Sequence, residues 1–130
     1  MSTLSKKIDF AILISVENAN PNGDPLCGNR PREDYDGYGE ISDVCLKRKI
    51  RNRLIDMNEP VFVQSNDHRV DEYKSLKARA EGCEELKKAS NGKTTDQDEF
   101  ARIACEQWID VRSFGQVFAF KGDKVSVGVR

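Results

Sequence analysis

The chain has 130 residues, a length typical of one domain or of part of one. Its 21 lysines and arginines nearly balance 22 aspartates and glutamates, and the net charge of −1 argues against a uniformly basic nucleic-acid binder. Residues 4–16 are too short and too interrupted by charge for a signal peptide or a membrane span, so we expect a cytoplasmic protein without membrane contact.

Residues 7–16 (KIDFAILISV) predict the first strand of a sheet. Phe10, Ile12, Ile14 and Val16 alternate onto one face, and alanine and leucine between them make the other face apolar as well. A strand that is apolar on both faces is typical of the middle of a sheet. We therefore expect this segment to be a central strand.

Residues 18–40 predict a long loop, because they contain four glycines, three prolines and four asparagines. A long loop inside a compact domain is often functional. This one carries Arg30 and Arg32, and its Tyr35 and Tyr38 are able to stack on bases. The alternative is a surface loop whose tyrosines fold back onto the core.

Residues 42–57 (SDVCLKRKIRNRLIDM) predict the helix around which the chain is organised. Ser42 is a suitable N-cap, and Asp43 suits the positive end of the helix dipole. Apolar residues recur at helical spacing and predict a stripe that faces the core. This stripe consists of Leu46, Ile50, Leu54 and Met57.

The same helix carries a run of cations without an intervening acid. The five cations are Lys47, Arg48, Lys49, Arg51 and Arg53. Arg48 and Arg51 are three residues apart and should lie side by side. Because a solvated helix normally mixes its charges, this pattern favours a surface laid along a phosphate backbone. The alternative is a solvated basic face that acids elsewhere in the fold balance.

The second half of the chain predicts further helices and a terminal hairpin. Residues 60–64 form a short strand pattern, and residues 65–91 are rich in mixed charge with helical apolar spacing that Gly82 weakens. Thr95 and Asp98 form a capping box before a helix over 96–108, whose buried stripe would be Phe100, Ile103, Ala104 and Trp108.

Residues 110–115 predict a tight connection, with Arg112 placed to reach a helix end or a phosphate. Residues 116–120 and 124–129 predict a hairpin around a turn at 121–123. Because no element follows to cover this hairpin, we expect the chain to be a fragment whose remainder completes the sheet.

Sequence motifs for catalysis are absent. There is no phosphate-binding glycine loop and no hydrolase or zinc-protease motif, and the four cysteines with the single His68 lack the spacing of a zinc site. We therefore expect no metal and no cofactor. Asp24 in the long loop is able to bind a metal or assist RNA cleavage, but a lone carboxylate in such a loop more often forms a turn.

Several long blocks resemble one known family. These blocks are NANPNGDP at 18–25, residues 29–54 from NRPR to IRNRL, FVQS at 62–65 and WIDVRSFGQVFAFKG at 108–122. They are similar to the backbone subunit of type I-C CRISPR interference complexes, within the CRISPR-associated RAMP superfamily. The resemblance covers nearly the whole chain, whereas members of the family are about twice as long.

The resemblance implies an α+β fold, with a ferredoxin-like, RNA-recognition-motif-type antiparallel sheet. Residues 1–130 would be the N-terminal part of one such domain, and residues 65–98 would form an inserted helical segment. Copies of the protein would polymerise along a guide RNA with other Cascade subunits and present it to target DNA, without cutting nucleic acid.

The resemblance also implies which residues contact the guide RNA. Arg48 and Arg51 come first, followed by Lys47, Lys49 and Arg53, while the loop would add amide and backbone contacts through Asn20, Asn22 and Gly23. This interpretation requires Arg48 and Arg51 to face a polyanion, so their replacement by alanine should weaken RNA binding without unfolding the domain. Ion pairs that turn both inward would contradict it.

Two other hypotheses stay open. One is an RNA endonuclease of the same superfamily that uses Asp24. The other is a structural interaction domain whose basic helix meets an acidic protein. A steep salt dependence of RNA binding would separate the guide-RNA hypothesis from this last one.

Overall fold

A computed structural model describes residues 9–90, 96–120 and 126–130, and the chain divides into two units, Met1–Cys45 and Leu46–Arg130. Helices and short antiparallel strands are both present, which confirms the α+β class. None of the described helices is long and apolar enough to cross a bilayer.

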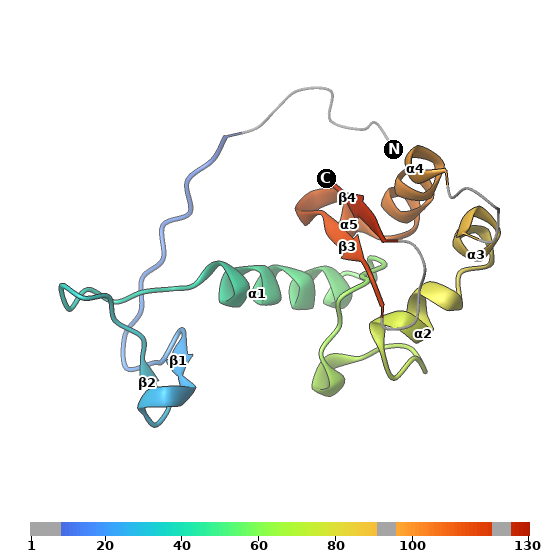
Figure 1. The fold of residues 1–130 in the computed structure, drawn as a ribbon. Coiled ribbons are helices and arrows are strands. Elements are labelled where there is room, and N and C mark those ends of the chain that lie inside the picture. Colours follow the sequence, from blue (N-terminus) through green and yellow to red (C-terminus); the bar gives the residue numbers. More distant parts are fainter. Residues whose placement is uncertain (1–8, 91–95, 121–125) are drawn as a thin grey trace. The chain divides into compact units, whose positions relative to one another are not determined.

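The first unit holds a small two-stranded sheet within the predicted loop (Figure 1). Strand β1 (Gly23–Asp24) pairs antiparallel with β2 (Arg30–Pro31), and the short 3-10 helix η1 (Pro25–Cys27) joins them. The turn after η1 uses left-handed backbone at Gly28 and Asn29. The loop prediction is therefore correct for most of residues 18–40, with a local hairpin built into it.

The predicted central strand does not form in residues 9–16, which run as an irregular segment in Figure 1. Phe10 and Leu13 are 75% and 99% exposed. A strand that is apolar on both faces needs neighbouring strands for its backbone and covering layers for its side chains. The described residues supply neither, so this prediction is wrong for residues 9–16; Lys7 and Ile8 lie outside the described residues.

Helix α1 (Asp43–Asp56) matches the predicted helix. The Ser42 hydroxyl accepts a hydrogen bond from the Cys45 N–H at 3.3 Å, as expected for a cap. Asn58 adopts a left-handed conformation just after the helix, which ends it.

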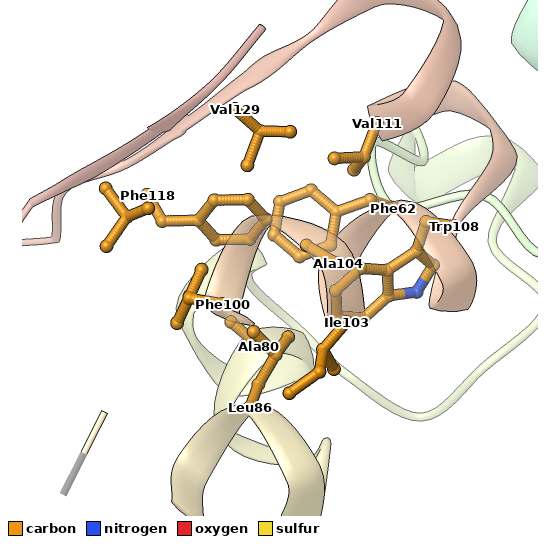
Figure 2. Close-up of a cluster of buried hydrophobic side chains, with 11 residues drawn as sticks. Phe62, Ala80, Leu86, Phe100, Ile103, Ala104, Trp108, Val111, Phe118 and Val129 are labelled. Atoms are coloured by element: carbon orange, nitrogen blue, oxygen red, sulfur yellow. The ribbon is translucent and has the colours of Figure 1, made fainter. Parts of the chain in front are cut away.

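The second unit contains the hydrophobic core, shown in Figure 2. Helix α4 (Gln97–Gln107) packs against α3 (Glu84–Ser90), α5 (Ile109–Phe114) and β4 (Val127–Val129). The predicted stripe of α4 is confirmed, because Phe100, Ile103, Ala104 and Trp108 are all buried. The cap of α4 is Asp96, and Thr95 lies outside the described residues.

The predicted hairpin is confirmed in part. Strand β3 (Gln116–Phe118) pairs antiparallel with β4, with Val117 opposite Gly128, while the turn at 121–123 lies outside the described residues. Phe118 places its ring against Phe62, with centroids 4.9 Å apart. In the described residues the strands form two separate pairs, so the single RNA-recognition-motif-type sheet stays a prediction.

Residues 65–90 form the short 3-10 helix η2 (Asn66–His68) and two helices, α2 (Leu76–Glu81) and α3, separated at Gly82. This agrees with the predicted helical character. The assignment of residues 65–98 as an insertion in one domain stays a prediction.

Two segments differ from their predicted structure. Residues 110–114 belong to helix α5 rather than to a tight connection, and Gly115 caps the end of this helix. Residues 60–64 are not a strand, although Val61 and Phe62 are buried. The backbone N–H groups of Phe62 and Val63 donate to the Asp110 carboxylate, so a side chain replaces the strand neighbour that this segment would need.

Candidate nucleic-acid interface

The basic helix α1 packs through a different side from the one its leucines indicate. Ile55 is its only buried residue, whereas Leu46, Ile50 and Leu54 are half-buried and Met57 is 56% exposed. The predicted core stripe is thus wrong at Met57. The side that packs most deeply includes Ile55 and Arg51, although Arg51 was expected to face RNA.

Arg51 forms a buried ion pair. Its Nε donates to an oxygen of Asp110 at 2.9 Å, and its guanidinium lies 5.1 Å from the ring centre of Phe114. The Asp110 carboxylate is fully buried and the Arg51 side chain is only 15% exposed. Breaking such a pair leaves a charge in a low-dielectric interior. Replacing Arg51 by alanine should therefore destabilise the fold, contrary to the expectation from sequence.

Arg48 also forms an ion pair, but an exposed one. Its guanidinium donates to both carboxylate oxygens of Asp67 at 3.0 Å. One residue further on, the His68 ring nitrogen lies 2.9 Å from an oxygen of Asp56, near the end of α1. Exposed pairs of this kind contribute little stability and exchange readily with solvent ions. Arg48 therefore keeps access to an external anion.

The remaining cations of α1 differ in their surroundings. Lys47 lies over the ring of Phe114, with 5.6 Å from its Nζ to the ring centre. Lys49 and Arg53 are exposed and make no ion pair within the part of the chain that the structure describes. Because they are four residues apart, they form one row on the helix. This row is the most accessible positive charge of α1.

The loop residues expected to contact RNA hold the first unit together. The Asn22 side chain accepts from both the backbone N–H and the hydroxyl of Ser42, at 2.9 and 2.8 Å. The Asn20 amide donates to the Asn29 carbonyl at 2.7 Å. A Cβ on Gly23 would meet the end of the Asn29 side chain, which would have to move aside.

Asp24 caps the short helix η1. Its carboxylate accepts a hydrogen bond from the Leu26 N–H at 2.9 Å, the turn-forming role that its sequence context favours. Among the described residues, no group of three histidines, cysteines, aspartates or glutamates is arranged to hold a metal. The geometry thus gives Asp24 a structural role as the cap of η1.

Other candidate residues of the loop lie at the surface. Tyr35 and Tyr38 are exposed rather than folded onto a core. Arg32 pairs with Glu40 at 2.7 Å, and this hydrogen bond raises the pKa of Arg32 above its ordinary value. The exposed tyrosine rings remain able to stack on bases.

A recess of about 270 Å³ in the second unit has a charged wall. There Arg79 donates to both oxygens of Asp71, at 2.7 and 2.8 Å, and to the carbonyl of Phe62. The two charges thus neutralise each other at short range. This recess offers a substrate much less net charge than the exposed row on α1.

Two acids decide which cations of α1 are accessible, and sequence patterns do not single them out for this role. Asp67 is 19 residues from Arg48, and Asp110 is 59 residues from Arg51. One indication of the role of Asp110 is present in the sequence, where it lies between the apolar residues Ile109 and Val111. A carboxylate that is buried with such neighbours needs a partner.

The second unit thus carries an exposed row of cations on α1, and the first unit carries a surface loop with exposed aromatic rings. Each feature is typical of proteins that bind polyanions. The family model described as CRISPR-associated protein Cas7 matches residues 6–129, and the chain belongs to this family.

A Haloferax volcanii protein named CRISPR-associated protein Cas7 is 31% identical to the chain over 128 residues. The match covers 93% of the chain but 34% of that relative, so the chain spans about a third of the length of the relative.

Proposed function

We propose that the protein is a guide-RNA-binding backbone subunit of a CRISPR surveillance complex, of the type I-C Cascade kind. Copies of it would line the guide RNA in the cytoplasm, together with other Cascade subunits, and would present the guide to target DNA. The protein would itself cut no nucleic acid. Membership of the Cas7 family supports the CRISPR role.

The observation that carries the RNA-binding part is the exposed row formed by Lys49 and Arg53. These cations lie on one side of α1, within reach of solvent, and are not neutralised by an acid in the described part of the chain. A helix that offers unpaired cations suits a phosphate backbone, which carries charge at regular intervals and no sequence information. Binding of this kind holds any guide regardless of its sequence.

The structure changes the order in which we rank the α1 residues. We place Lys49 and Arg53 first and Arg48 next, because Arg48 has only an exposed partner. Lys47 follows, beside the Phe114 ring. Arg51 becomes a residue that supports the helix, since its buried pair with Asp110 occupies it. Asn20, Asn22 and Gly23 would act by shaping the loop.

The test is a titration of single-stranded RNA against the full-length protein at several salt concentrations. We expect Lys49→Gln with Arg53→Gln to weaken binding about tenfold or more at low salt and to flatten the slope of log K against log salt by about 1.4, for two lost phosphate contacts. Lys87→Gln with Lys88→Gln removes the same charge from the exposed side of α3 and should leave both quantities unchanged.

The outcomes separate the hypotheses. Wild-type protein without salt-sensitive RNA affinity would reject the RNA-binding function and favour a domain that binds an acidic protein. If the α3 variant loses as much affinity as the α1 variant, net charge rather than the α1 row governs binding. An effect that depends on the RNA sequence would contradict recognition through the backbone.

A further inference from the structure

The short helix η2 places an acid directly beside the cationic side of α1. Asp67 pairs with Arg48, and the adjacent His68 contacts Asp56. Arg48 and Asp56 are eight residues apart, about 12 Å along a helix, with Asn52 between them at the same spacing. Residues spaced by four lie on one row, so η2 spans the row of α1 that contains Arg48, Asn52 and Asp56.

The exposed row of Lys49 and Arg53 is the neighbouring row. Each of these residues follows a member of the η2-spanned row by one position, about 100° around the helix. Arg48 is thus the cation that borders both η2 and the exposed row. Its partner Asp67 belongs to η2, which contacts α1 both at Arg48 and, through His68, at Asp56. Both side chains of the Arg48–Asp67 pair are nevertheless more than half exposed, at 56% and 74%.

We infer that Asp67 is a built-in competitor of the RNA phosphate for Arg48. In the free protein both oxygens of the Asp67 carboxylate accept from one nitrogen of the Arg48 guanidinium, Nη2, from which a phosphate would also accept. When RNA lies along Lys49 and Arg53, a phosphate displaces Asp67, and Arg48 joins the contact. This inference rests on the proposed RNA-binding function and adds a residue that limits the affinity of that surface.

The competitor has a physical consequence for affinity rather than for salt dependence. The counterions released on binding come from the condensed atmosphere of the RNA, so a phosphate that meets Arg48 releases its counterion whether or not Asp67 held Arg48 before. The cost of breaking the Arg48–Asp67 pair instead weakens RNA binding at every salt concentration. Removing the charge of Asp67 should remove this cost.

The experiment is a double-mutant cycle with full-length protein and a single-stranded RNA, measured by fluorescence anisotropy across salt concentrations. We expect Asp67→Asn to bind RNA about threefold more tightly at low salt, the size of one exposed ion pair. We expect its salt slope to match that of wild type, because the same phosphates lose their counterions in both proteins. In the Arg48→Gln background, Asp67→Asn should change neither quantity.

Glu85→Gln is the matched control, because it removes one negative charge from the exposed side of α3. An Asp67→Asn variant that binds like wild type would overturn the inference, and so would a gain that persists without Arg48 or that Glu85→Gln reproduces. If wild-type protein shows no salt-sensitive RNA binding, the proposed function itself fails. If wild type binds but the cycle shows no coupling, only the competitor role of Asp67 fails.

Discussion

Asp110 accepts hydrogen bonds from three donors although its carboxylate is fully buried. These donors are the Nε of Arg51 at 2.9 Å and the N–H groups of Phe62 and Val63, at 2.6 and 3.1 Å. A buried carboxylate is tolerated only when its charge is compensated and its lone pairs are occupied. Asp110 thereby joins the middle of α1, an irregular apolar segment and the first turn of α5.

Removing either partner of this pair should destabilise the protein. We expect Arg51→Ala to lower the free energy of unfolding by about 3–5 kcal/mol, because it leaves the Asp110 charge buried without a cation. Denaturant unfolding of the full-length protein measures the effect. Arg53→Ala removes an exposed arginine of the same helix and should cost less than about 0.5 kcal/mol. Equal, small losses in both variants would show that the buried pair is not structural.

Asp24 provides the residue-level test of catalysis. Its carboxylate caps η1, so Asp24→Ala should cost about 1 kcal/mol of stability and leave nucleic acid uncut, as in wild type. The measurement incubates the assembled full-length protein with guide, complementary target RNA and divalent metal ions. Regularly spaced cuts by wild type that Asp24→Ala abolishes would establish the endonuclease hypothesis instead.

At the scale of elements, local sequence patterns predicted two features that the structure confirms. Helical spacing predicted the buried stripe of α4, and two strand patterns on either side of a turn predicted the pairing of β3 with β4. The segment at 60–64 and helix α5 could not be predicted in this way. Their conformation depends on Asp110, whose partners are 47 and 48 residues away and which no local pattern identifies.

Gly115, between α5 and β3, gives a prediction at this scale. Its φ of 71° and ψ of 166° belong to a region that is essentially restricted to glycine, and a Cβ would lie 2.8 Å from the Val129 carbonyl oxygen. We expect Gly115→Ala to destabilise the full-length protein by roughly 2 kcal/mol or more in thermal or denaturant unfolding.

The matched control for Gly115→Ala is Gly128→Ala, in the facing strand. A Cβ at Gly128 meets nothing within 4 Å, and its φ is not positive, so this change should be close to neutral. If both variants lose the same stability, the conformation assigned to Gly115 is wrong.

At the scale of the whole molecule, the near-zero net charge hides a local excess of cations. The run of five cations in α1 was visible in the sequence, and so was its candidate role. The accessibility of each cation was not, because it depends on acids that return from distant parts of the chain. Asp110 occupies Arg51 and Asp67 occupies Arg48, while Lys49 and Arg53 stay exposed. A charge pattern thus locates a candidate surface, and tertiary structure selects the residues within it.

Stability at acid pH is a second property of the whole molecule. The buried Arg79 allows us to predict in which direction the free energy of unfolding changes as the pH falls. Hydrogen bonds from Arg79 hold the pKa of the Asp71 carboxyl below its ordinary value of 3.8. Since the folded state then binds this proton less readily than the unfolded state, ionised Asp71 stabilises the fold at neutral pH. This contribution is lost as the pH falls through 3.8 towards the lower pKa of the folded state.

The expected result is a pH-dependent penalty for Asp71→Asn in the full-length protein. The loss of unfolding free energy relative to wild type should be largest and constant above about pH 5, and it should shrink below pH 4 as the wild-type carboxyl is protonated too. Denaturant unfolding of both proteins between pH 3 and pH 7 measures this difference. Glu72→Gln, at the exposed neighbouring position, should show no such trend. A penalty for Asp71→Asn that stays constant down to pH 3 would mean that Arg79 does not stabilise the ionised carboxylate.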